Sequence, residues 1–145
     1  MSFRGVLLKL GLDVVDNALH LLNPLAGYIF PTVSPSTAAN AKASTGDLDA
    51  DDWGTNITNT GASGAIVLTL LTAVGNAGMF FRVYVTVAQQ VSLSPQTTEG
   101  IYLAGSGEAN KDVVIAGTIG NYVDVYCDGT QYHVVGYSGV VTKEA

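Results

Sequence analysis

The stretch Met79-Phe80-Phe81-Arg82-Val83-Tyr84-Val85-Thr86-Val87-Ala88 is the longest part of the chain with the pattern of a β-strand. Its odd-numbered positions are all apolar, whereas its even-numbered positions include Arg82, Tyr84 and Thr86. Because the side chains of a strand point alternately to its two faces, this pattern predicts one face in the core and the other toward water. The many β-branched and aromatic residues favour the same structure. We therefore expect the fold to be organised around a half-buried strand at 79–88.

Shorter runs with the same alternation lie on both sides of this strand, at a spacing of roughly ten residues and separated by turn residues. No helical pattern lies between them. This arrangement predicts a mainly β, antiparallel sandwich or barrel-like domain over residues 55–145. The other strands are expected at 56–60, 65–70, 90–94, 99–103, 112–116, 121–127 and 130–137.

The last two predicted strands are joined by Asp128-Gly129, the preferred central pair of a two-residue type I′ hairpin turn. Counting outward from this turn pairs Val125 with Tyr132 and Asp124 with His133. The second pair is expected to be a cross-strand ion pair on the surface. Because side-chain direction alternates, the register also assigns each residue to a face. The residues that would share the buried face are Val123, Val125, Cys127, Tyr132 and Val134.

The first part of the chain has a different pattern. Residues 3–22 have helical periodicity, with charged and titratable side chains in one narrow strip and apolar side chains around the rest. This predicts an apolar helix at 1–22 that contacts other chains, or alternatively one that packs across the β-domain. Residues 23–54, which are rich in Pro, Ser, Thr and Ala, are expected to form an extended arm. The residues expected to contact a partner are Phe3, Leu7, Leu10, Val14, Leu21, Tyr28, Ile29 and Phe30.

The composition limits the kinds of partner. Only 12% of the 145 residues are charged and 48% are hydrophobic, so we expect some apolar surface to meet another chain. The net charge of −6 and the scattered Lys and Arg residues argue against nucleic acid as a partner. No run of about 18 apolar residues occurs, so no membrane span is expected.

The acidic stretch Asp47-Leu48-Asp49-Ala50-Asp51-Asp52 has the D-x-D-x-D spacing with which a calcium loop begins. However, Asp52 stands where that loop requires Gly, and Thr58 stands where it requires Glu. We therefore predict a solvated acidic turn, with a bound calcium ion as the alternative. Trp53, which follows directly, is expected to close one end of the core.

No catalytic residue, cofactor or metal is predicted, and the chain is not expected to be an enzyme. Asp124, His133 and Ser138 lack a nucleophile elbow and an oxyanion donor nearby in the sequence. Cys127, the only cysteine, is expected to be a small buried apolar residue rather than a reactive thiol. The tyrosines of the strands are expected to cover the core or contact a neighbouring subunit, with a glycan site as the alternative. They are Tyr84, Tyr102, Tyr122, Tyr126, Tyr132 and Tyr137.

Several ordered blocks of the sequence resemble a small β-domain of tailed-bacteriophage virion proteins, over about residues 55–141. The chain departs from that domain at Tyr132, where Trp is expected, and at Leu71-Thr72, where Pro-Ala is more usual. The blocks that carry the resemblance are Ile57-Thr58-Asn59-Thr60-Gly61-Ala62-Ser63-Gly64-Ala65-Ile66-Val67-Leu68-Thr69-Leu70, Val87-Ala88-Gln89-Gln90-Val91-Ser92-Leu93-Ser94-Pro95, Gly120-Asn121-Tyr122-Val123, Cys127-Asp128-Gly129-Thr130-Gln131-Tyr132 and Gly139.

Domains of this kind occur in head-decoration, head-fibre and tail-fibre proteins, commonly as trimers. The resemblance therefore implies a virion structural protein, which we expect to be a capsid decoration protein on the capsid surface. Its expected partners are itself, as a homotrimer, and the major capsid protein or another virion protein, which the N-terminal arm would hold. The alternative is a tail- or head-fibre knob protein that contacts a glycan on the host surface.

Overall fold

The chain divides into two compact units, Met1–Thr32 and Val33–Ala145. In the first unit, two short antiparallel strands are described, β1 (Leu12–Val15) and β2 (Ala18–Leu21). The residues that the computed structural model describes are 12–15, 18–21 and 39–145.

The helix expected over residues 1–22 lies mostly outside the described residues and stays a prediction. Residues 23–38 of the expected arm also lie outside them. Each unit is therefore considered by itself below, and the description concentrates on the second.

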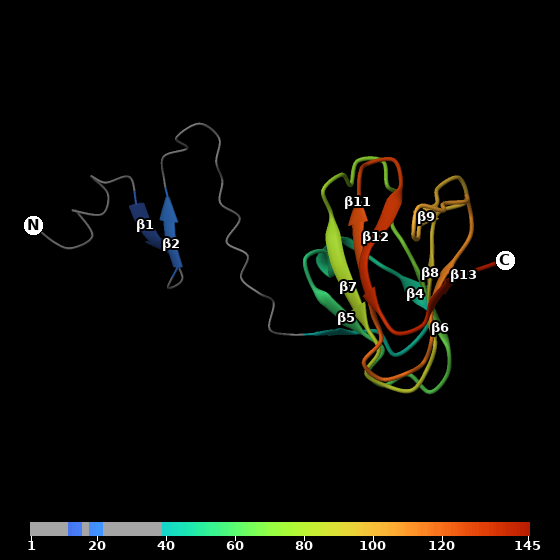
Figure 1. The fold of residues 1–145 in the computed structure, drawn as a ribbon. Coiled ribbons are helices and arrows are strands. Elements are labelled where there is room, and N and C mark those ends of the chain that lie inside the picture. The colour runs from blue at the N-terminus through green and yellow to red at the C-terminus, as the bar shows by residue number, and fades with distance from the viewer. Residues whose placement is uncertain (1–11, 16–17, 22–38) are drawn as a thin grey trace, which may run out of the picture. The chain divides into compact units, whose positions relative to one another are not determined.

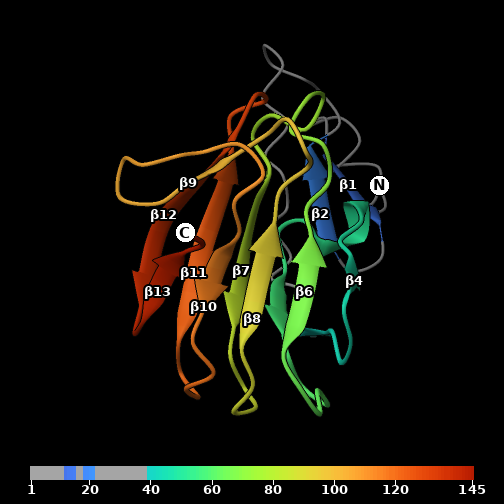
Figure 2. The same ribbon diagram turned by 90° about the vertical axis from the view of Figure 1, so that its right-hand side faces the viewer.

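The second unit consists of two β-sheets that form two layers (Figures 1 and 2). One sheet has six strands, in the spatial order β3 (Asn40–Ala41), β5 (Asn56–Thr58), β7 (Phe80–Tyr84), β11 (Tyr122–Cys127), β12 (Tyr132–Ser138) and β9 (Ile101–Tyr102). The other has five, in the order β13 (Val141–Lys143), β10 (Val113–Ile115), β8 (Val91–Ser94), β6 (Ile66–Thr69) and β4 (Gly46–Asp47).

The prediction of a mainly β fold is confirmed, but the prediction of antiparallel sheets is wrong, because both sheets are mixed. From β3 to β8 successive strands alternate between the two layers, so that each strand pairs in parallel with the next but one. Antiparallel pairs join β7, β11 and β12 in one sheet and β8, β10 and β13 in the other. Residue alternation within a strand reports which face is buried and says nothing of the direction of the neighbouring strand.

One hydrophobic core fills the space between the sheets, and the inward positions of the strands supply it. On the central strand β7, Phe81 and Val83 are buried whereas Phe80 and Arg82 face outward, as the alternation predicts. Trp53 packs against this core with its ring centroid 5.6 Å from that of Phe81. The largest fully buried side chains are Tyr132, Phe81, Leu48, Ile57, Leu68, Leu70, Leu93, Ile101 and Ile115.

The strand β7 ends at Tyr84, before the end of the predicted strand at 79–88. Beyond Tyr84, the buried side chain of Asn59 binds the backbone groups that a neighbouring strand would otherwise bind. The side chain of Asn59 is fully buried, and its Oδ1 accepts hydrogen bonds from the backbone N–H groups of Thr86 (2.8 Å) and Val87 (3.0 Å). Its Nδ2 donates to the carbonyl oxygens of Val87 (2.9 Å) and Gln89 (3.0 Å). The amide thereby satisfies backbone groups that have left the sheet.

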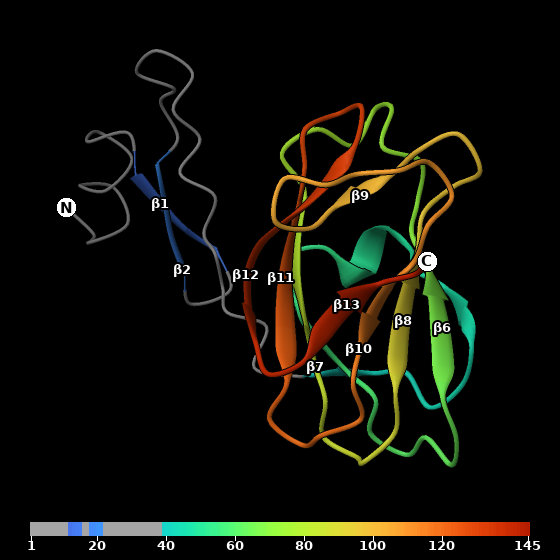
Figure 3. The same cartoon turned by 45° about the vertical axis from the view of Figure 1, so that its right-hand side comes forward.

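Each of the two sheets ends on both sides in a very short strand. β3 and β9 border the six-stranded sheet, β4 and β13 border the five-stranded sheet, and none of the four exceeds three residues. Very short edge strands protect against edge-to-edge association with other sheets. Figure 3 shows β13 crossing the open side between the layers. Two of these edges come from residues 40–47, a segment that the sequence pattern assigns to the arm.

An ion pair with a buried carboxylate and a partly buried ammonium group fixes that segment to the rest of the second unit (Val33–Ala145), which we call the β-unit. Asp52, at the end of the short 3-10 helix η2 (Ala50–Asp52), is only 1% exposed. Its Oδ2 lies 3.0 Å from Lys42 Nζ and accepts a hydrogen bond from the Asp49 backbone N–H (2.8 Å). Its Oδ1 accepts one from the Asn40 side chain. The acidic turn is therefore not simply solvated as predicted, because one of its carboxylates is internal and paired.

The predicted register of the β11–β12 hairpin is wrong by two residues. Val125 pairs with Val134, and Cys127 pairs with Tyr132. Because the slip is an even number of residues, the assignment of side chains to faces survives it. The residues Val123, Val125, Cys127 and Tyr132 are all fully buried, and Val134 is partly buried against the core.

The side chain of Asp128 explains the slip. Its Oδ1 accepts hydrogen bonds from the backbone N–H groups of Thr130 (2.7 Å) and Gln131 (2.8 Å), and its own N–H donates to the Gln131 carbonyl oxygen (3.1 Å). The two residues at the centre of the turn are therefore Gly129 and Thr130. Gly129 has a φ of +95°, and Gly at the first central position is typical of a type II′ turn.

Candidate functional site

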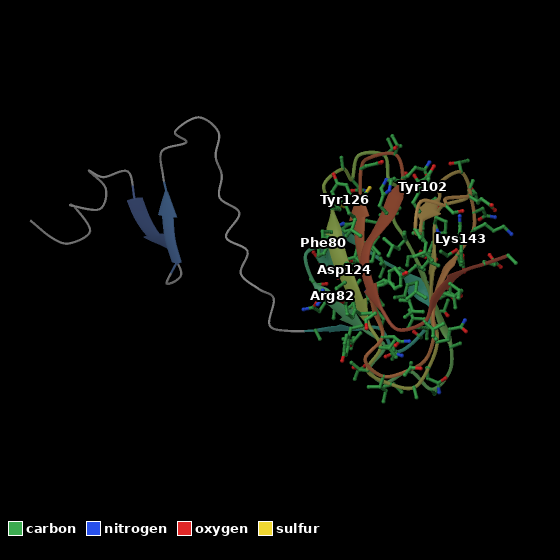
Figure 4. All side chains as sticks on the ribbon, in the orientation of Figure 1. Phe80, Arg82, Tyr102, Asp124, Tyr126 and Lys143 are labelled. Carbon is green, nitrogen blue, oxygen red and sulfur yellow. The ribbon has the colours of Figure 1, made fainter. Side chains whose placement is uncertain are left out.

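The outer face of the six-stranded sheet carries a line of four aromatic side chains at right angles to its strands. The register pairs Phe80 on β7 with Tyr126 on β11, Tyr126 with His133 on β12, and His133 with Tyr102 on β9. Each of the four is next in sequence to a fully buried residue, so the alternation of the strand turns it outward. We call Phe80, Tyr126, His133 and Tyr102 the aromatic row. Figure 4 labels three of its members across the upper part of the sheet.

Two rings of the aromatic row are accessible, and the other two are held in place by stacking. Phe80 is 45% exposed and Tyr126 is 38% exposed. At the other end, the rings of Tyr102 and His133 are stacked, with centroids 5.2 Å apart and planes inclined by 20°. Gly107 lies so close to Tyr102 that a Cβ at this glycine would come within 2.6 Å of the tyrosine ring. The loop that follows β9 therefore holds one end of the row.

A charged pair lies beside the aromatic row on the same face. Arg82 donates to Asp124 through Nε (2.6 Å) and Nη2 (2.8 Å), and its guanidinium lies 4.4 Å from the ring centre of Tyr122. The hydrogen bonds to Asp124 raise the pKa of Arg82 above its ordinary value. Bidentate pairing and contact with a ring hold the guanidinium in one orientation. In Figure 4 this pair lies below Phe80 and Tyr126.

A second carboxylate lies at the opposite side of the aromatic row. His133 Nε2 lies 2.8 Å from Asp128 Oδ2, at the tip of the hairpin. The hydrogen bond from His133, together with those from Thr130 and Gln131, lowers the pKa of Asp128 well below its ordinary value. Asp128 is therefore ionised at neutral pH. The aromatic row is thus flanked by Asp124 on one side and Asp128 on the other.

The predicted ion pair between Asp124 and His133 is wrong. Asp124 bonds instead to Arg82 of β7, and His133 bonds to Asp128. The two-residue slip of the hairpin explains both changes, because it places His133 opposite Tyr126. A β-bulge beyond Val125 shifts the pairing by a further residue and leaves Asp124 opposite Gly136.

The prediction that Cys127 is a buried apolar residue is confirmed. Its side chain is fully buried, its Sγ lies 3.6 Å from the Ala73 carbonyl oxygen, and burial raises the pKa of the thiol. Next to it, Glu99 is 5% exposed and accepts hydrogen bonds at Oε1 from Thr72 Oγ1 (2.8 Å) and the Ala73 N–H (2.7 Å). Tyr132, the last member of this internal group, donates to the Leu71 carbonyl oxygen (2.8 Å). These contacts fasten the loop after β6 to the core.

The other predicted residues divide into two groups. Of those expected to contact a partner, Val14 lies in β1 and Leu21 in β2, and the other six lie outside the described residues. Of the tyrosines, Tyr126 and Tyr102 belong to the aromatic row, whereas Tyr132 is internal. The sequence pattern alone did not find Phe80 and His133 as neighbours of these tyrosines, because the row depends on three strand pairings.

Within residues 12–15, 18–21 and 39–145, no three His, Cys, Asp or Glu side chains gather as a metal-binding group. No helix in the part of the chain that the structure describes is long and apolar enough to cross a membrane. No protein-family model matches the chain, and no curated protein sequence matches it significantly.

Proposed function

We propose that the chain is a structural protein of a tailed-bacteriophage virion, a non-enzymatic capsid decoration protein that forms a homotrimer. The observation that carries the proposal is the set of ordered sequence blocks over about residues 55–141 that resemble a virion β-domain. In the structure two of these blocks fall on β5–β6 and on the β11–β12 turn, which are structural parts of one β-unit. The N-terminal arm holds the protein to the major capsid protein or to another virion protein.

The edges of the two sheets support a role as a separate unit attached to the capsid shell, and not as a part of the shell itself. Its sheet edges are covered by its own short strands, so the unit does not need a neighbour to complete a sheet. The low charge fraction of the whole chain favours an apolar contact with other chains. We place that contact in the apolar residues of the first 30 positions.

A second candidate function is a head- or tail-fibre knob that contacts the host. The exposed aromatic row favours it, because solvent-exposed aromatic side chains in a continuous line are typical of binding surfaces. The two candidates differ in the number of copies per particle, which is high for a decoration protein and low for a fibre.

Two deletions of different length test the role of the arm. We expect the chain without residues 1–38 to keep a folded β-unit but to lose both trimerisation and attachment to particles. Deletion of residues 1–45 is expected to destabilise the β-unit as well, because it removes Asn40 and Lys42 and leaves Asp52 buried without its cation. Analytical ultracentrifugation measures the oligomeric state, and co-sedimentation with particles that lack the protein measures attachment.

The outcomes of these deletions separate the parts of the proposal. If the chain without residues 1–38 still attached to particles at full occupancy, the anchoring role would belong to the β-unit and not to the arm. A full-length chain that sediments as a monomer at micromolar concentration would contradict the homotrimer. Equal thermal stability of the two deletion variants would contradict the boundary at residue 38.

A further inference from the structure

We propose that the aromatic row is a binding site for a glycan, namely an extended chain of neutral β-1,4-linked pyranose units. This inference rests on the row itself and holds for either location of the protein on a particle. Ligand binding by the row is separate from attachment to the particle, which we assign to the N-terminal arm.

The geometry of the row fits a flat chain of rings. Its members stand on four adjacent strands, and adjacent strands lie about 4.8 Å apart. Phe80 and Tyr126, which pair across adjacent strands, are therefore separated by a distance close to the repeat of the sugar units in an extended β-1,4-linked glycan, and the whole row is about 14 Å long. A pyranose ring presents an apolar face of C–H groups, which packs on the face of an aromatic ring. Phe80 and Tyr126, the two exposed members, therefore offer the surface for sugar rings. The rings of Tyr102 and His133 are stacked on each other, with Gly107 against Tyr102, and they form one end of the row.

Polar groups on both sides of the row provide hydrogen bonds for sugar hydroxyl groups. Asp124 and Asp128 offer carboxylate acceptors, and Arg82 has N–H groups beyond the two that bind Asp124. The Tyr126 hydroxyl both donates and accepts within the row itself. Arg82 and His133 are already held by their carboxylate partners, so a ligand meets groups that are fixed in advance.

Charge decides which glycan fits. The two carboxylates flank the row, Arg82 is already neutralised by one of them, and the whole chain carries a net charge of −6. An anionic chain, such as a sialylated or uronic acid glycan or a nucleic acid, would be repelled from this face. A neutral glycan meets no such repulsion.

The size of the row argues against a second protein chain as its occupant. A fully buried aromatic side chain covers about 150–250 Å², and Phe80 and Tyr126 are less than half exposed. The four side chains together therefore offer about 400 Å² at most, against about 800 Å² from each partner in a stable protein interface. An area of this size suits an oligosaccharide.

The test is a calorimetric titration of the full-length protein with cellohexaose and with chitohexaose, two neutral β-1,4-linked chains. We expect at least one of them to bind with a Kd of about 1 mM or tighter. Tyr126→Ala is expected to weaken that binding about tenfold or more, and Phe80→Ala to weaken it in the same direction. Tyr126→Phe keeps the ring and is expected to change the Kd by about twofold at most.

Tyr137→Ala is the matched control, because Tyr137 is a tyrosine of β12 with 50% exposure that lies outside the row. It is expected to leave binding unchanged, with thermal melts confirming that all variants are folded. The proposal is overturned if neither hexasaccharide binds at millimolar concentration, or if Tyr126→Ala and Tyr137→Ala weaken binding equally. It is also overturned if Tyr126→Ala changes the sedimentation coefficient of the full-length protein, since the row would then be an interface between copies. None of these results would bear on the number of copies per particle.

Discussion

Replacement of Asn59 by alanine is expected to lower the free energy of unfolding by about 4 kcal/mol. The substitution removes the only side chain that bonds both backbone N–H groups of Thr86 and Val87 in the described structure, and both hydrogen bonds are part-buried. Each buried backbone group that loses its partner costs about 1–3 kcal/mol, and the empty space left by the amide adds to this. Because small domains are stable by only about 5–15 kcal/mol, the variant is close to unfolding. Urea unfolding followed by the fluorescence of Trp53 measures the loss.

Asn56→Ala provides the control for this prediction. Asn56 is the first residue of β5, three positions before Asn59, and its side chain is exposed. A substitution at such a position changes stability by about 0.5 kcal/mol at most. Equal losses for the two alanine variants would show that the hydrogen bonds of Asn59 do not hold the segment that follows β7.

Replacement of Lys42 by methionine is expected to lower the free energy of unfolding by about 3 kcal/mol. Methionine keeps most of the apolar stem of the side chain but removes the ammonium group that lies 3.0 Å from Asp52. Asp52 is 1% exposed, so its carboxylate would remain in the interior without its cation. Removing one member of a buried ion pair is costly for this reason, even where the intact pair contributes little. Chemical unfolding of the purified variant measures the change.

The matched control is Lys143→Met. Lys143 makes only a long contact of 3.4 Å to the Ser106 carbonyl oxygen at the surface, and its loss is expected to cost about 0.5 kcal/mol or less. If Lys42→Met were as stable as Lys143→Met, residues 40–47 would not be fixed to the β-unit by this ion pair. The boundary between arm and β-unit would then move back toward residue 55.

The sequence predicts the strands and their buried faces well, because both depend on residues that are close in the chain. The alternation at 79–88 places Phe81 and Val83 in the core, and the structure confirms it. The same holds for the hairpin, where the buried face is correct although the register is not. The register depends on one side chain, Asp128, whose hydrogen bonds move the centre of the turn by one residue. The general preference of Asp-Gly for a type I′ turn does not reveal that the Asp128 side chain will bond to the turn and shift its centre.

The pairing of the strands is harder to predict from the sequence. Each of the strands from β3 to β8 lies in the layer opposite to its predecessor, and only the complete arrangement makes the parallel pairs visible. β3 and β4 have two residues each, too few for any periodic pattern. Consequently the sequence pattern assigns residues 40–52 to a polar arm, although Leu48 is in the core and Asp52 is a buried carboxylate paired with Lys42.

The candidate site shows the same limit. The individual tyrosines of the aromatic row are visible in the sequence, but their alignment with Phe80 and His133 requires β7, β11, β12 and β9 to be placed side by side. The partner of Asp124 is likewise a residue 42 positions earlier in the chain. Local spacing therefore suggested His133 as that partner, whereas the sheet brings Arg82 to it.

The most direct test of the proposed function is the number of copies of this chain in purified virions, measured by quantitative mass spectrometry against the major capsid protein. A decoration protein is expected at a simple, fixed ratio to the major capsid protein, and therefore in many copies per particle. A few copies per particle would instead identify a fibre or tail component. Absence of the chain from the particles would contradict a virion protein of either kind.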